Sequence, residues 1–174
     1  MKKNLIVMGI VILGLALVIS GCTQQNNNPP PGGNTPKTVT MTAGELLNDL
    51  TMEGFGTSTV NWTYNSLADG DTLILQDVIN NISYDTTADK TQVKFNTTSS
   101  GGVSSSAVFY IKENITGSYA IGDAVNITVT IKQVTFELNS VTYNMEVFQE
   151  QYEQTDFQTS MFNPAMPQTV ISKA

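Results

Sequence analysis

The chain has 174 residues and a net charge of −7, and among its charged residues there is neither histidine nor arginine. The absence of histidine excludes Ser-His-Asp and Cys-His nucleophile systems, and it removes the usual ligand of zinc sites. Nucleic-acid binding depends on Lys and Arg, so an acidic chain with eight scattered lysines repels polyanions.

The first element is an apolar segment that follows two positive residues. Lys2 and Lys3 precede an apolar run over 5–20, which leads through Gly21 to Cys22, the only cysteine of the chain. A run of this length is shorter than the roughly 20 residues that a membrane-spanning helix needs. A positive start followed by a short apolar run and small residues is typical of a secretory signal.

This segment resembles the signal peptide and lipobox of a prokaryotic membrane lipoprotein, bacterial or archaeal. The resemblance implies cleavage after residues 1–21, lipidation of Cys22 and a position on the outer side of the cytoplasmic membrane, at the cell surface. Two acyl chains would anchor such a protein stably. Losing Lys2 and Lys3 with the signal would change the net charge from −7 to −9. An uncleaved signal anchor is the alternative, and it gives the same topology.

Residues 22–39 are predicted to be the lipidated cysteine and a disordered tether, because this stretch is polar and rich in Pro and Gly. Residues 40–65 are predicted to hold a short helix and a leading strand. Thr42 and Glu45 fit a capping box at the start of the helix. The strand, Thr59–Tyr64, alternates apolar and polar side chains. The apolar stripe of the helix consists of Leu46, Leu47 and Leu50.

Residues 66–152 are predicted to be mainly β, with turn residues between short β-rich runs. The clearest signal is a hairpin with Asn139-Ser140 as its turn, which places Val134 opposite Met145 on one face. The inward positions are odd through Ile131 and even from Val134, so we predict a β-bulge near Lys132-Gln133. The strands are expected at 72–84, 91–96, 106–112, 124–133 and 141–150.

Gly-Asp precedes a strand twice, at Gly70-Asp71 and at Gly122-Asp123. Glycine allows a positive φ, and the aspartate can accept hydrogen bonds from nearby backbone N–H groups. A calcium site at Asp69-Gly70-Asp71 is the alternative, but the loop lacks further oxygen ligands at a specific spacing.

The order of these parts, with the stretch Tyr119–Val129 leading into the fourth strand, resembles an OB-fold, a small five-stranded Greek-key barrel. The resemblance covers 66–152 and leaves 153–174 as a C-terminal tail. The expected helix between the third and fourth strands is missing, and an open β-sandwich is the alternative. OB domains bind oligonucleotides or oligosaccharides, and acidity disfavours the former.

Aromatic side chains could form a ligand platform for sugar or peptide stacking, at Trp62, Tyr64 and Tyr110, although with Phe95 and Phe109 they could also fill a barrel.

Glu146, Glu150 and Glu153 could serve acid–base chemistry, with solvated charge as the alternative. Met145, Met161 and Met166 could bind copper, although the filling of gaps in the core by these flexible side chains is the simpler explanation.

Five Asn-x-Ser/Thr sequons are candidate glycosylation sites: Asn61, Asn81, Asn96, Asn114 and Asn126.

These patterns predict a lipid-anchored, non-catalytic binding or interaction module with no cofactor, no metal and no nucleic-acid partner. Its ligand would be an unidentified protein, peptide or glycan. The alternatives are a carboxylate-dependent enzyme acting on surface glycans and an OB-type nucleic-acid binder.

Overall fold

A computed structural model describes residues 35–98, 104–154 and 164–174. The fold is mainly β, as predicted, with two sheets, two short α-helices and a 3-10 turn in the described ranges. The strands are β1 (Thr38–Met41), β2 (Leu50–Glu53), β3 (Thr59–Tyr64), β4 (Thr72–Val78), β5 (Asn81–Asp85), β6 (Lys90–Thr98), β7 (Ser104–Lys112), β8 (Ala124–Leu138), β9 (Val141–Phe148) and β10 (Ile171–Lys173). The helical elements are α1 (Ala43–Asp49), α2 (Gln149–Tyr152) and η1 (Gln168–Val170).

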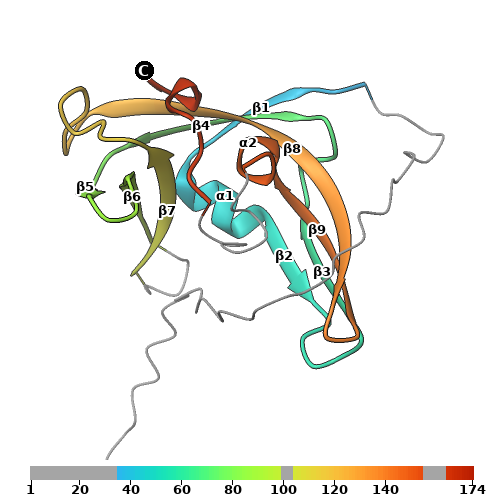
Figure 1. Ribbon diagram of the computed structural model, residues 1–174. Helices are drawn as coiled ribbons and strands as arrows, with labels where there is room; N and C mark the ends of the chain where they lie inside the picture. The colour runs from blue at the N-terminus through green and yellow to red at the C-terminus, as the bar shows by residue number, and fades with distance from the viewer. Residues whose placement is uncertain (1–34, 99–103, 155–163) are drawn as a thin grey trace, which may run out of the picture.

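One sheet has seven strands in the order β1-β4-β8-β9-β3-β2, with β10 added to β8, and the other has the order β5-β6-β7. The long strand β8 arches across the molecule and connects the region above β5–β7 with the β8–β9 turn at the far end (Figure 1). Its first half pairs with β4 and its second half with β9. Strand β8 therefore joins the β4 part of the sheet to the β9 part.

The strand predicted at 72–84 is two strands, β4 and β5, which belong to different sheets. The chain passes between the sheets at Ile79, whose N–H donates to the Asp123 carbonyl and whose carbonyl accepts from the Gly122 N–H. The described chain has ten strands in two sheets, where a leading strand and five strands in one barrel were predicted, and the strands not predicted include β1, β2 and β10. Strand β9 pairs with β3, and the described part of the chain shows no ladder between β7 and β9.

The main core lies between the two sheets and includes Leu46 of α1. A series of ring contacts crosses it: Phe95 meets Phe109 edge-on at 5.8 Å, Phe109 stacks on Phe148 at 6.0 Å, and Phe148 stacks on Tyr64 at 6.4 Å between ring centroids. These contacts link β6 and β7 to β9 and β3, across the place where no ladder joins them. Apolar burial therefore replaces backbone pairing on this side.

The β-bulge predicted near Lys132-Gln133 is wrong. Residues 124–130 pair one-to-one with β4, and residues 131–138 pair one-to-one with β9. Ile131 and Val134 are both buried, yet residues three apart in a strand point to opposite faces. The buried face of β8 therefore changes sides, and Val134 belongs with Met145 and Val60, outside the main core.

The predicted hairpin is confirmed. Val134 pairs with Met145, and the rings of Phe136 and Tyr143 stack at 5.2 Å between centroids. Asn139 and Ser140 have φ of 52° and 62°, as a two-residue turn of type I′ requires.

The capping box of α1 is also confirmed, since Thr42 and Glu45 exchange side-chain and backbone hydrogen bonds. Leu50, predicted on the helix, instead ends it and begins β2. The end of the predicted tether is ordered as well: Thr38 and Val39 pair with β4 in parallel, because the edge of β4 leaves backbone groups free to accept a strand.

Candidate functional site

Two turns of the same sequence type, Ala-x-Gly-Asp, are built in the same way. In the first, the Ala68 N–H donates to the Asp71 carboxylate at 2.9 Å and the Asp71 N–H donates to the Ala68 carbonyl at 2.9 Å. In the second, Ala120 and Asp123 make the same two contacts at 2.9 and 3.1 Å. The intervening glycines have φ of 86° and 91°. The predicted turn chemistry is therefore confirmed at both places.

Each turn also fixes a strand at a critical point. The first turn exchanges two backbone hydrogen bonds of 2.8 Å with Ile131, where β8 changes partners. The second exchanges two backbone hydrogen bonds, of 2.8 and 2.9 Å, with Ile79, where the chain changes sheets. The two turns thus hold the two points at which the sheet pairing is interrupted.

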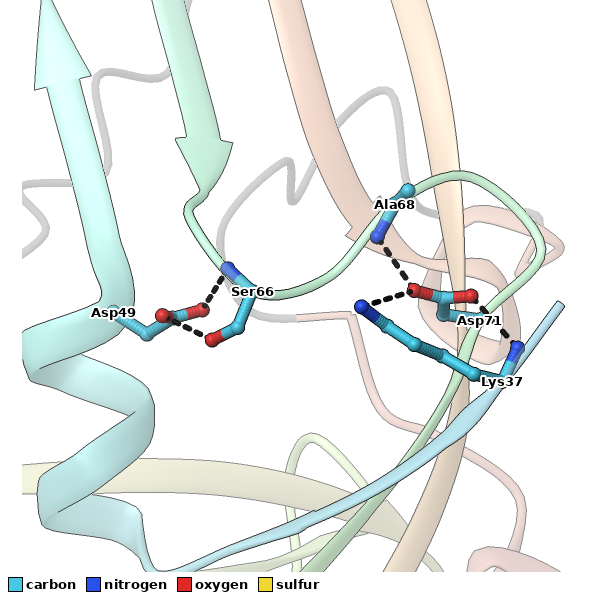
Figure 2. A network of polar contacts seen from close by, with 5 residues as sticks. All are labelled: Lys37, Asp49, Ser66, Ala68 and Asp71. Carbon is cyan, nitrogen blue, oxygen red and sulfur yellow. Dashed lines mark hydrogen bonds and ion pairs between the residues drawn. The ribbon is translucent and has the colours of Figure 1, made fainter. Parts of the chain in front are cut away.

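Asp71 is the more buried of the two turn aspartates, with 3% of its surface exposed. Its carboxylate accepts the Lys37 N–H at 2.9 Å, and the Lys37 ammonium lies 3.8 Å from it (Figure 2). Asp123 has a counterpart cation in Lys173 at 3.1 Å. The Ala120 N–H, and then Lys173, lower the pKa of Asp123.

Two further aspartates accept hydrogen bonds close to the first turn. Asp49, at the end of α1, accepts from the N–H and the hydroxyl of Ser66 (Figure 2). Asp69 accepts the Gln133 N–H at 2.7 Å. The contacts of Asp69 and Asp71 come from N–H and ammonium donors, which supports a turn here over the calcium alternative.

Two of the predicted acid–base candidates also accept backbone donors. Glu146 accepts the Tyr64 N–H at 2.6 Å, and Glu150 accepts the Thr130 N–H at 3.0 Å through both oxygens. Burial raises the pKa of Glu146. The hydrogen bond from the Tyr64 N–H lowers this pKa, and the charges of nearby aspartates raise it further. Glu153 accepts a bond from the Gln149 side chain. Glu146 and Glu150 therefore complete backbone hydrogen bonding where strands lose their neighbours.

The predicted aromatic platform is not one surface. Trp62 and Tyr64 belong to β3, and Tyr64 stacks against Phe148 of the core. Tyr110 belongs to β7 of the other sheet, on the face opposite to the core residue Phe109.

Tyr110 has its own polar partners. Its hydroxyl accepts from the Gln92 amide at 3.0 Å, and the Lys90 ammonium lies 4.4 Å from its ring centroid. The structure thus separates Tyr110 from the other two members of the predicted platform.

The predicted glycosylation sites differ in exposure. Asn81, Asn96 and Asn114 are exposed. Asn61 is half-buried and accepts from the Asn144 amide at 3.0 Å. Asn126 is half-buried too, and its Oδ1 is buried without a partner among the described residues.

The methionines proposed for copper are dispersed. Met166 is fully buried in the main core, Met145 packs outside it, and Met161 lies outside the described residues. The described ranges contain no group of three or more Cys, Asp or Glu side chains arranged to hold a metal ion. Cys22 and the signal also lie outside the described residues.

No protein-family model, curated protein or solved structure matches this chain. In the described part of the chain, neither helix has the length and apolar character needed to cross a bilayer.

Sequence reasoning did not identify the loop that presents Phe55, which is 67% exposed. Its signal was the sequence Gly54-Phe55-Gly56, an aromatic residue between two glycines.

Proposed function

We propose that this protein is a lipid-anchored module on the outer side of the cytoplasmic membrane, where it binds a protein, peptide or glycan and catalyses no reaction. The observation that carries the proposal is the position of Cys22. It is the only cysteine, and it follows a short apolar run that two lysines precede. A chain without histidine or arginine supports a binding role over the commonest kinds of catalysis.

We also propose that the folded part is an elaborated OB-type barrel. In support, β5-β6-β7 and β4-β8-β9 pair in the neighbour order of such a barrel, with β4 and β5 as the halves of its first strand. Strands β2 and β3 extend the hairpin β8–β9, and the hairpin between the fourth and fifth strands of OB domains often contributes to binding.

The test of the anchor is the variant Cys22→Ala, expressed in a prokaryotic host that processes lipoproteins. The wild-type chain should be processed and remain in the membrane fraction. The variant should lose lipidation and processing at this position, with the precursor retained through its uncleaved apolar segment. Identical processing of the two chains would contradict the proposal.

One observation favours a second candidate, a carboxylate-dependent enzyme acting on surface glycans. The raised pKa of Glu146 is a property that general acids share. A panel of glycan substrates tests it: turnover that Glu146→Gln abolishes in a folded protein would replace the binding role with an enzymatic one.

A further inference from the structure

The most exposed large apolar side chain in the described ranges is Phe55, in the loop between β2 and β3. Its surface is 67% exposed, and only Ile121, at 63%, is comparable. A single exposed apolar residue is common on protein surfaces. Phe55 calls for an explanation because of the loop that holds it.

The loop around Phe55 is fixed by its own contacts. Gly54 has φ of 80°, and a Cβ at this position would lie 2.0 Å from the Thr59 carbonyl oxygen, so only glycine fits. The Thr57 N–H and hydroxyl both donate to the Gly54 carbonyl, at 3.0 and 2.7 Å. The loop therefore holds its backbone in one shape while it directs an aromatic side chain to solvent.

The neighbouring loop extends this tip. The Thr142 N–H, just after the β8–β9 turn, donates to the Ser58 carbonyl at 2.9 Å, and the two loops lie side by side at the lower end of Figure 1. We call residues 54–59 and 138–142 the tip. The tip contains no charged residue. The exposed Glu53 and Glu137 border it, so the end of the tip that carries Phe55 can enter an apolar medium without the desolvation of a charge while these two carboxylates stay in water.

The length of the chain before the domain allows the tip to reach the plane of the anchor. The Lys37 N–H is bonded to Asp71, whose carbonyl accepts the Ile131 N–H, so the domain begins beside the middle of β8. From Ile131 to Leu138, β8 extends about 23 Å at the usual rise of a strand. The fourteen residues 23–36 can span at most about 50 Å, which exceeds this length.

We propose that Phe55 inserts into the outer surface of the membrane that carries the anchor, so that the tip is a second membrane contact. This inference rests on the proposed lipid anchor. One phenylalanine would bind a membrane weakly from solution, but the tether makes the contact intramolecular and raises the effective concentration of the surface. The acidity of the chain favours an uncharged lipid surface over an anionic one.

Ile121 provides a matched control. It is nearly as exposed as Phe55, and it lies in the turn before Ala124, where β8 begins, whereas the tip lies where β8 ends. A domain that points its tip toward the membrane directs Ile121 away from it.

The experiment uses the lipidated full-length protein with its single tryptophan removed by Trp62→Phe. A new tryptophan is then introduced by Phe55→Trp in one variant and by Ile121→Trp in the other. Both are reconstituted in phosphatidylcholine vesicles with and without bromine on the acyl chains, which quenches tryptophan on contact. Circular dichroism checks that the variants keep the β fold.

We expect brominated lipid to reduce the fluorescence of the Phe55→Trp variant at least about twofold and to leave that of Ile121→Trp unchanged. Absence of quenching at position 55, or equal quenching at both positions, would overturn the inference, and the former would point to a protein partner for Phe55. Flotation with vesicles and the mass of Cys22 are measured on the same sample. Protein that floats without quenching at position 55 contradicts only the tip contact, whereas unlipidated protein that does not float contradicts the anchor as well.

Discussion

The substitution Asp71→Asn tests whether the first Ala-x-Gly-Asp turn stabilises the fold at the point where β8 changes partners. The buried carboxylate accepts two backbone N–H groups at 2.9 Å, from Ala68 and Lys37. A hydrogen bond to a charged group contributes about 1.5–3 kcal/mol, and an unsatisfied buried donor costs about 1–3 kcal/mol. Asparagine keeps one acceptor and turns an NH₂ group toward the other donor, so we expect a loss of about 3 kcal/mol. The Lys37 ammonium adds little, since its side chain is 57% exposed.

Urea unfolding of the chain from residue 23 onward, followed by circular dichroism and by the fluorescence of Trp62, measures this loss. A loss of this size should lower the thermal midpoint by roughly 10 °C. Asp123→Asn is the matched control, because Asp123 makes the same turn but its side chain is 29% exposed. Its loss should be clearly smaller. Equal losses for the two variants, or a loss below about 1 kcal/mol for Asp71→Asn, would refute the argument from burial.

Three further predictions concern the loop before β3, the half-buried Glu146 and the helix α1. Gly54→Ala should destabilise the protein by several kcal/mol, since its Cβ would clash with backbone, whereas Gly56→Ala, with φ of 83° and open space, should cost about 1–2 kcal/mol in urea titrations. Because the pKa of Glu146 is raised in the folded state, its ionisation lowers stability as the pH rises above about 4. Unfolding curves of Glu146→Gln should therefore improve relative to wild type between about pH 4 and 7, and a pH-independent difference would disprove this. Leu46→Ala should cost about 2–5 kcal/mol by the same measurement, because Leu46 is 4% exposed in the main core, and a loss under 1 kcal/mol would show that α1 is not packed there.

Local patterns predicted local structure well in this chain. The capping box at Thr42 and Glu45, the strand Thr59–Tyr64 and the turn at Asn139-Ser140 all depend on residues close in sequence, and all three are present. The same holds for the two Gly-Asp turns, each of which is closed by hydrogen bonds within four residues. In each case the chemistry that specifies the structure lies inside the pattern.

Predictions failed where distant segments determine the structure. The break at Ile79 depends on the turn at 120–123, more than 40 residues away, which pairs with its backbone. The change of buried face between Ile131 and Val134 looked like a bulge, because sequence alone does not reveal that the two halves of β8 bury opposite faces. The Lys37 N–H that donates to Asp71 and the Tyr64 N–H that donates to Glu146 are likewise distant in sequence, and backbone groups leave no side-chain signature.

Mass spectrometry of the protein isolated from membranes tests whether a lipid on Cys22 holds the domain there. A lipid anchor requires an amino-terminal peptide that begins at Cys22 and carries the mass of a lipid on that residue. A peptide that retains residues 1–21, or one that begins at Cys22 without lipid, would contradict it.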